Sequence, residues 1–328
     1  MSLIQSAAIA QSSFQDIPII DVSQITNHDP SIRRTLALEI RTACIEVGFF
    51  YVINHGVPEN LVEEFLSQTK EFFALPLESK LKIENKTTPN MMGYSALLSG
   101  NNDPNGGGDF QEGFEFTAEP LDTSGQESNV NSIGRNTWPS GLPKFREAAL
   151  RYYDAVVNLG KSLFPIFALA LELDEHFFDE KTNNAAALMR SLRYPPQENL
   201  KDEHVIGIGA HTDWECFTIL WQEPGIQALQ VLNSEKQWID APPIPGTFVI
   251  NLGDQFARWT NGIFKSTVHR AINKSDGCRY SIPLFVGANW DAKLDPIPGC
   301  VSSDRPLRYE VITAGEYVKA KLAETYKH

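Results

Sequence analysis

The stretch VIGIGAHTDWECFTILWQ (residues 205–222) joins two runs rich in β-branched and aromatic residues through a short polar segment. Working outward, similar short runs separated by Pro, Gly and Asn continue from about Leu188 to Val301. They are MRSLRYP, VIGIGAHTD, CFTILWQ, ALQVLN, KQWID, TFVINLG, STVHRAI and RYSIPLFVG. About eight short strands at this spacing predict an antiparallel sandwich or barrel.

The residues before this region have a mixed pattern. IPIIDVS (17–23) predicts a short strand, and Asp29 followed by Pro30 predicts the start of a helix. We expect Gly48 to end that helix, before the strand FFYVIN. A second amphipathic helix is expected in PENLVEEFLSQTKEFFAL, and FQEGFEF (110–116) is typical of an aromatic strand. The first third therefore combines helices and strands.

The chain divides into two predicted regions. Residues 1–140 form the mixed N-terminal region, and residues 141–328 hold a long helix, the strand-rich core and a C-terminal helix. The long helix is expected over about 143–173, where Pro165 should kink or divide it. A T-x-x-E capping box at 313–316 predicts the start of the last helix.

Composition excludes several classes of protein. A formal net charge of −13, from 41 acidic against 28 basic residues, disfavours binding to nucleic acid or anionic membranes. The first 14 residues lack a basic leader and have too short an apolar run for a signal or membrane span, so we expect a flexible tail. The four cysteines lie far apart, which favours a reducing, cytoplasmic location. They are Cys44, Cys216, Cys278 and Cys300.

Three residues carry a metal-binding pattern, and we call them the triad: His211, Asp213 and His269. The first two are two positions apart, so in a strand they project from the same face. His269 lies in another β-branched run and can approach from a facing strand. Two histidines with one carboxylate are typical of non-haem Fe(II) oxygenases, whereas zinc more often binds a third histidine or thiolates.

Arg279 and Ser281 form a second pattern ten residues or more beyond His269. They share one face of a strand, while Tyr280 points away. A guanidinium beside a hydroxyl is suited to a carboxylate. A short dicarboxylic acid such as 2-oxoglutarate could therefore chelate the metal at one end and reach Arg279 at the other. The alternative is a structural salt bridge and an ordinary strand hydroxyl.

The motif H-T-D, the distant His269 and R-Y-S resemble the isopenicillin N synthase-like family of 2-oxoglutarate/Fe(II)-dependent oxygenases. IPIIDVS and VGFFYVINHGVP resemble the leading region of that family, and INLGDQFARWTNG followed by STVHRA resembles its second conserved block. The resemblance covers nearly the whole chain. It implies a mixed α and β fold with a double-stranded β-helix (jelly-roll) core and flanking helices.

The resemblance also implies roles for individual residues. The triad would bind Fe(II), Arg279 and Ser281 would bind the far carboxylate of 2-oxoglutarate, and dioxygen would be the oxidant. Tyr194, in RYPP, matches a tyrosine that commonly contacts the cosubstrate. Two residues earlier, where many plant members carry asparagine, this chain has Leu192.

Four aromatic residues are candidates for a substrate pocket, although aromatic side chains at alternate strand positions more often belong to the core. They are Trp214, Phe116, Phe114 and Phe285. Trp214 is the best candidate because it directly follows Asp213. The Gly-rich segment 100–109 is expected to be either a lid over the site or a surface insertion.

These patterns predict a cytoplasmic, 2-oxoglutarate- and Fe(II)-dependent dioxygenase that hydroxylates, desaturates or rearranges a small organic molecule in specialised metabolism. Two alternatives stay open at this point. The first is a 2-oxoglutarate-independent Fe(II) oxidase or cyclase in which Arg279 holds the carboxylate of the substrate. The second is a non-catalytic β-helix binding protein that contains a metal.

Overall fold

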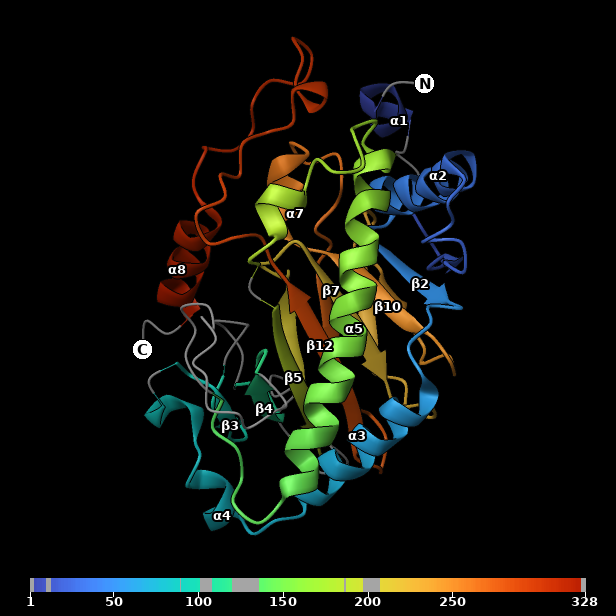
Figure 1. Ribbon diagram of the computed structural model, residues 1–328. Helices are drawn as coiled ribbons and strands as arrows, with labels where there is room; N and C mark the ends of the chain where they lie inside the picture. Colours follow the sequence, from blue (N-terminus) through green and yellow to red (C-terminus); the bar gives the residue numbers. More distant parts are fainter. Residues whose placement is uncertain are drawn as a thin grey trace.

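The structure is a computed structural model that describes part of the chain, in which two β-sheets are flanked by helices (Figure 1). The described residues are 3–9, 13–88, 90–100, 108–119, 136–185, 187–196 and 207–325. The predicted lid segment falls largely on residues 101–107, which lie outside the described residues. No helix in the described ranges is both long and apolar enough to cross a membrane.

The larger sheet has eight strands in the order β1-β2-β10-β7-β12-β5-β4-β3. Its pairs are antiparallel except for β1 with β2. The strands are β1 Ile19–Asp21, β2 Phe49–Ile53, β3 Gly93–Ser95, β4 Glu112–Phe116, β5 Ala187–Tyr194, β7 Phe217–Gln222, β10 Phe248–Leu252 and β12 Arg279–Val286. The N-terminal strands thus extend the same sheet as the core strands, and the predicted division at residue 140 stays a prediction.

The smaller sheet has the order β6-β11-β8-β9 and is antiparallel throughout. Its strands are β6 Ile208–His211, β8 Leu229–Leu232, β9 Trp238–Asp240 and β11 His269–Ala271. The eight strands predicted between Leu188 and Val301 are all present, as β5 to β12. Together the two sheets form the jelly-roll core, which confirms the predicted fold class.

An apolar cluster fills part of the space between the two sheets. Leu220 and Val249 come from the larger sheet, and Leu229 and Val231 from the smaller one. Tyr51 of β2 packs with them and donates its hydroxyl hydrogen to the carbonyl oxygen of Pro242 at 2.6 Å. Burial of this cluster holds the two sheets against each other.

The helix α2 (Pro30–Glu46) begins as the sequence predicts. The side chain of Asp29 accepts a hydrogen bond from the backbone N–H of Ser31 at 2.8 Å, which caps the helix. Gly48 then takes a φ of +76°, and its N–H bonds to the carbonyl oxygen of Ala43 at 2.8 Å. The chain can therefore turn directly from α2 into β2.

Helices cover the outer face of the larger sheet. The long helix α5 (Pro143–Ala170) crosses this face beside α2 and α3 (Glu59–Phe73), as Figure 1 shows. It continues through Pro165, so this proline does not divide the helix, and the expected kink stays a prediction. A proline costs one backbone hydrogen bond, and burial of the helix on both sides of Pro165 outweighs that loss.

Shorter elements complete the fold. They are α1 Leu3–Ile9, α4 Leu77–Leu81, η1 Asn85–Thr87, α6 Asp179–Thr182, α7 Asp254–Trp259, η2 Pro298–Cys300 and α8 Ala314–Thr325. Leu3 is buried and α1 contacts α2 and η2, so the expectation of a flexible tail is wrong for residues 3–9. The capping box before α8 is confirmed, because Thr313 Oγ1 accepts from the N–H of Glu316 at 3.1 Å.

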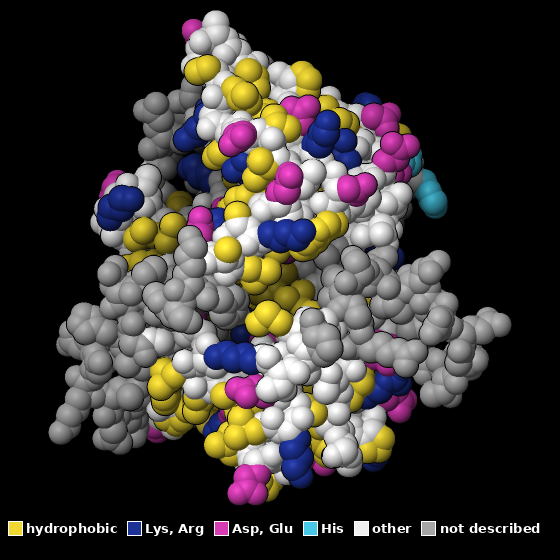
Figure 2. Space-filling view, turned by 90° about the vertical axis from the view of Figure 1, so that its left-hand side faces the viewer, with side chains coloured by type: hydrophobic (Ala, Val, Ile, Leu, Met, Phe, Trp, Pro, Cys, Tyr) yellow, Lys and Arg dark blue, Asp and Glu magenta, His cyan; other side chains and the backbone are white. Residues whose placement is uncertain are grey.

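One face of the surface can be followed in Figure 2. Acidic and basic side chains of the described residues are interspersed there, with hydrophobic side chains gathered around a hollow near the middle. On this face, the excess of acidic residues in the chain is therefore not gathered into one patch.

Gly48→Ala should destabilise the protein strongly, because an added Cβ would lie 2.3 Å from the carbonyl oxygen of Lys265. Gly56 is the matched control, since it has the same φ of +76° but nothing within 4 Å of its Cβ position. Gly56→Ala should cost only the conformational strain of about 1–2 kcal/mol. We expect Gly48→Ala to cost roughly 1–3 kcal/mol more, measured by urea unfolding. Equal losses would contradict this account.

Candidate metal centre and ligand cavity

The register of the smaller sheet brings the two histidines of the triad together. In the antiparallel pair of β6 and β11, His269 lies directly opposite His211, and their ring centroids are 4.3 Å apart. Asp213 follows two residues after the end of β6, and its Oδ1 lies 3.6 Å from Nε2 of each histidine. The potential ligand atoms of all three residues lie within 4.8 Å of one another. The structure thus unites the three residues that the sequence singles out.

Backbone contacts fix the orientation of both imidazoles. Nδ1 of His211 lies 2.7 Å from the carbonyl oxygen of Gly209, and Nδ1 of His269 lies 3.1 Å from that of Thr267. A carbonyl accepts, so we assign the ring proton to Nδ1, which leaves the Nε2 lone pairs directed at the centre. Burial lowers the pKa of His269 to about 4. This imidazole is therefore neutral at pH 7, as a metal ligand must be.

The carboxylate of Asp213 is oriented by two donors from the larger sheet. Its Oδ2 accepts hydrogen bonds from the hydroxyl of Thr218 on β7 and from Nδ2 of Asn251 on β10, the latter at 2.6 Å. Oδ1 is thereby turned towards the histidines. Burial raises the pKa of Asp213, but the histidines and these two donors outweigh burial and hold the pKa below its usual value. The carboxylate is therefore ionised.

Sequence reasoning missed Thr218 and Asn251. Thr218 lies in the strand that follows the H-T-D turn, and Asn251 is the single polar residue of FVINL. An amide in the middle of a buried strand needs a partner, and this was the available signal. The identity of that partner depends on the packing of the two sheets.

The start of α7 holds the turn that carries Asp213. The N–H of Asp254 donates to the carbonyl oxygen of Asp213 at 2.8 Å, and the N–H of Gly253 donates to that of Cys216 at 2.9 Å. A Cβ on Gly253 would lie 2.3 Å from the carbonyl oxygen of Glu215. Glycine is therefore required for this close approach.

The donor set fits Fe(II). Two imidazole nitrogens and one oxygen of a carboxylate on one side of a metal leave the opposite positions open for exogenous ligands. The second oxygen of Asp213 is already satisfied by Thr218 and Asn251, so the carboxylate offers a single oxygen. The side chains that orient the metal ligands are thus already in place around the triad.

Arg279 is a buried cation at the far end of the same site. Its guanidinium lies over the ring of Tyr194 at 4.7 Å, donates to Gln222 Oε1 at 2.9 Å and to Ser281 Oγ at 3.3 Å. The residue is 1% exposed, and its Nε has no partner among the described residues. Burial lowers its pKa, although an arginine stays protonated in proteins.

No carboxylate of the described residues forms an ion pair with Arg279. The alternative of a structural salt bridge is therefore unsupported in the described part of the chain. Leaving a guanidinium buried without a counter-ion is costly, and an anionic ligand removes that cost. The partner residues Gln222 and Tyr194 fix the plane of the guanidinium in which a carboxylate would bind.

One cavity between the two sheets joins Arg279 to the triad. Its empty volume is about 460 Å³, part of which is open to solvent. The residues that line it are Arg190, Leu192, Tyr194, Ile208, His211, Asp213, Thr218, Leu220, Leu229, Asn251, His269, Ala271, Arg279, Ser281, Pro283 and Phe285. Leu192 lies opposite Ser281 in the register of β5 and β12. It gives the cavity an apolar wall at that position.

The four aromatic candidates separate in the structure. Phe285 lines the cavity. Trp214 is half-buried in the turn after β6 and is not part of the cavity wall. Phe114 and Phe116 are fully buried in an aromatic cluster with Phe145 of α5, so the structure places them in the core and not in the cavity.

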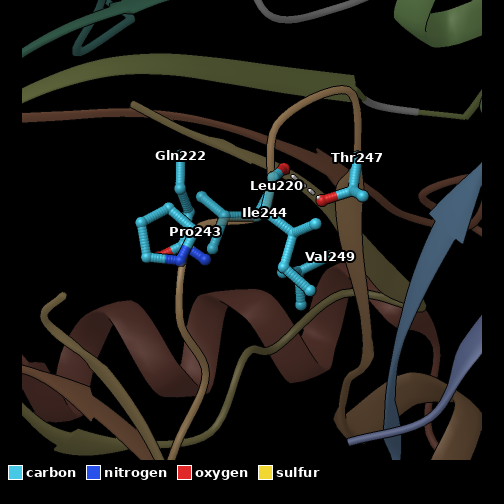
Figure 3. Close-up of a pocket in the computed structure, with 6 residues that line it drawn as sticks. All are labelled: Leu220, Gln222, Pro243, Ile244, Thr247 and Val249. Carbon is cyan, nitrogen blue, oxygen red and sulfur yellow. Dashed lines mark hydrogen bonds between the residues drawn. The ribbon is translucent and has the colours of Figure 1, made fainter. Parts of the chain in front are cut away.

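A second crevice, shown in Figure 3, lies behind Gln222. It is lined by Leu220, Gln222, Pro243, Ile244, Thr247 and Val249. The hydroxyl of Thr247 donates to the carbonyl oxygen of Ile244 at 2.8 Å across its rim. The crevice leaves no space for a water molecule, so it does not hold a ligand.

Two family models match the chain. Residues 17–141 match the model of the non-haem dioxygenase in morphine synthesis N-terminal domain, and residues 184–288 match that of the 2OG-Fe(II) oxygenase superfamily. The 2-oxoglutarate-Fe(II) type oxidoreductase hxnY of Emericella nidulans is 36% identical over 319 residues, which cover 94% of this chain and 90% of that protein. A homoarginine-6-hydroxylase of Glycine max is 34% identical over 300 residues, which cover 87% and 89% of the two chains.

Solved structures show the same architecture. A full-length Neurospora crassa protein, solved in complex with alpha-KG and thymine, is 29% identical with a TM-score of 0.83, and the match covers 94% of this chain and 97% of that one. JOX2 in complex with 2OG, Fe and JA is 25% identical, with a TM-score of 0.76 over 96% and 92% of the two chains.

Thr218→Val should weaken metal binding by about tenfold or more, because it removes one of the two donors that orient Asp213. Thr69→Val is the matched control, since the Thr69 hydroxyl is buried without a partner among the described residues. Anaerobic titration with Fe(II) measures both affinities. A loss of affinity in the control, or unchanged affinity in Thr218→Val, would contradict the orienting role.

Proposed function

The chain belongs to the 2-oxoglutarate/Fe(II) oxygenase superfamily and is a non-haem Fe(II)- and 2-oxoglutarate-dependent dioxygenase, and from this premise we propose how its own residues divide the work. We propose that His211, Asp213 and His269 hold Fe(II), and that Arg279 and Ser281 bind the far carboxylate of 2-oxoglutarate. Tyr194 positions the guanidinium of Arg279. The relatives named as 2-oxoglutarate-Fe(II) type oxidoreductases and as hydroxylases support this reading over the alternatives of a 2-oxoglutarate-independent oxidase and a non-catalytic binding protein.

The observation that carries this proposal is the uncompensated charge of Arg279. Its guanidinium is buried in the cavity that also holds the triad, and no described carboxylate pairs with it. A dicarboxylic acid that chelates the metal places its second carboxylate at a distance from the metal, where Arg279 can receive it through charge-assisted hydrogen bonds. Ser281 Oγ lies 3.3 Å from the same guanidinium and supplies a further donor.

When bound, Fe(II) and 2-oxoglutarate supply the oxidising chemistry, in which dioxygen oxidises the primary substrate while 2-oxoglutarate is converted to succinate and carbon dioxide. The residues of this chain position and enclose these groups. The buried triad keeps one carboxylate oxygen and two imidazole nitrogens directed at the metal. Leu192, Pro283 and Phe285 give the cavity an apolar wall on the substrate side.

The substrate is a small organic molecule in this proposal, and the reaction is a hydroxylation, desaturation or rearrangement in specialised metabolism. The relatives support this class: one is named a homoarginine-6-hydroxylase, and a solved neighbour contains thymine. The widely spaced cysteines, all of them free, are consistent with the cytoplasmic location that we also propose.

His211→Ala should reduce formation of succinate from 2-oxoglutarate to background, because the metal loses one of three protein ligands. The assay uses Fe(II), air and 2-oxoglutarate, with succinate quantified by mass spectrometry. His176→Ala is the control, since His176 is exposed, pairs with Asp179 and does not line the cavity. Full activity of His211→Ala would contradict the assignment of the triad.

Arg279→Gln should weaken 2-oxoglutarate binding by at least about 30-fold, because the buried positive charge is lost. Arg270→Gln is the matched control: Arg270 also lies over an aromatic ring, that of Trp238, and donates to a glutamine, Gln230. It does not line the cavity. Calorimetric titration of the Mn(II)-loaded proteins without oxygen measures both affinities. Unchanged affinity in Arg279→Gln would show that 2-oxoglutarate binds elsewhere.

A further inference from the structure

The cavity contains a second arginine, at the end opposite Arg279. On β5, Arg190, Leu192 and Tyr194 project from one face and all line the cavity. Tyr194 pairs with Arg279 in the register of β5 and β12, whereas Arg190 lies four residues further along the strand. Four residues of strand span roughly 13 Å. The two guanidinium groups therefore mark the two ends of the site.

The two arginines differ in charge compensation. Nε of Arg190 donates to Glu115 Oε1 on the neighbouring strand β4 at 3.0 Å. Glu115 is itself buried and accepts from Ser95 Oγ at 2.9 Å and from Asn85 Nδ2 at 3.3 Å. The Arg190 end of the cavity thus carries its own counter-ion, and the Arg279 end lacks one among the described residues.

We propose that Arg190, fixed by Glu115, is a specificity-determining residue that binds a neutral oxygen acceptor of the primary substrate, such as the carbonyl of an amide, lactam or cyclic urea. This inference rests on the proposed function, because it assigns the opposite end of the cavity to 2-oxoglutarate. Arg190 would orient the substrate and leave its oxidisable carbon over the triad.

The preference for a neutral group follows from the ion pair. A half-buried, charge-compensated arginine such as Arg190 still offers directional N–H donors, but together with its counter-ion it does not supply a net positive charge. A carboxylate brought to Arg190 would lose its hydration and would also lie near the charge of Glu115. A carbonyl loses much less hydration and accepts the same hydrogen bond. Anions are therefore directed to Arg279 and neutral acceptors to Arg190.

The remaining walls are consistent with a substrate that has a flat or apolar body. Phe285 and Pro283 of β12 and Leu192 of β5 line the same cavity as the two arginines. Gly113 of β4 also lies here: a Cβ at this position would be 2.7 Å from Ser95 Oγ and 3.0 Å from Leu192 Cδ2. Its lack of a side chain lets these neighbours pack closely beside Arg190.

Arg193, on the same strand as Arg190, forms an ion pair that is purely structural. It pairs with Glu112 of β4, the counterpart of Glu115, but it lies outside the cavity wall. Glu112 has two further donors, Lys80 and Tyr94, each at 2.7 Å. Removing either arginine thus leaves a buried glutamate with two donors, so Arg193→Met is a matched control for Arg190→Met.

The test is a binding screen on the full-length protein loaded with Mn(II) and saturating 2-oxoglutarate, without oxygen. The probes are pairs of small molecules that share a skeleton and differ in charge, such as benzamide with benzoate, phenylacetamide with phenylacetate, and nicotinamide with nicotinate. Affinities are measured by calorimetry. We expect at least one neutral member to bind about tenfold more tightly than its anionic partner.

Arg190→Met should weaken that binding by about tenfold, and Arg193→Met should leave it unchanged. Glu115→Gln should reverse the preference, because it leaves the charge of Arg190 uncompensated. The affinity for 2-oxoglutarate should be the same in all three variants, which also shows that they are folded.

Three results would overturn the proposal: no neutral probe whose binding depends on Arg190, preferential binding of the anionic members by the unmodified protein, or equal losses in Arg190→Met and Arg193→Met. Failure of the proposed function has a different signature. In that case the unmodified protein would not bind 2-oxoglutarate, and the loss would appear before any probe is added.

Discussion

The antiparallel pairing of β6 with β11 is the constraint on which the site depends, because it places His269 opposite His211. The pairing of β6 with β11 does not by itself hold the third ligand, Asp213, in place. Asp213 is oriented by Thr218 and Asn251, which belong to the larger sheet. The centre therefore exists only when both sheets are packed together, and the apolar cluster between them contributes to metal binding as well as to stability.

The N-terminal region takes part in the same construction. Its strand β2 pairs with β10, and the ring of Phe49 on β2 contacts His269 edge-on, with 5.1 Å between ring centroids. Gly48 permits the sharp turn that leads into this strand. A change in the packing of α2 against the sheet would therefore reach the metal centre through β2, although none of the triad residues lies in the N-terminal half of the chain.

Sequence alone predicts the core strands, the start of α2 and the triad, because each depends on a local pattern: alternation, a capping residue, or two ligands on one strand face. It does not predict which face of a strand lies towards the cavity. Phe114 and Phe285 have the same aromatic character, yet only Phe285 lines the cavity, because β4 directs Phe114 against α5. Partners such as Asn251 depend on the register between distant strands, which no local pattern contains.

The difference in charge between the two ends of the cavity also depends on the register between distant strands, so the sequence alone does not predict it. Arg190 and Glu115 are 75 positions apart, and their pairing follows from the register of β4 with β5. Arg279 lies on the other side of β5, where no described strand supplies a carboxylate. Because the compensated Arg190 lies on β5 and the uncompensated Arg279 lies on the neighbouring β12, the two ends of the cavity differ in charge before any ligand binds. A dianionic cosubstrate and a neutral substrate are thereby directed to opposite ends of one continuous space.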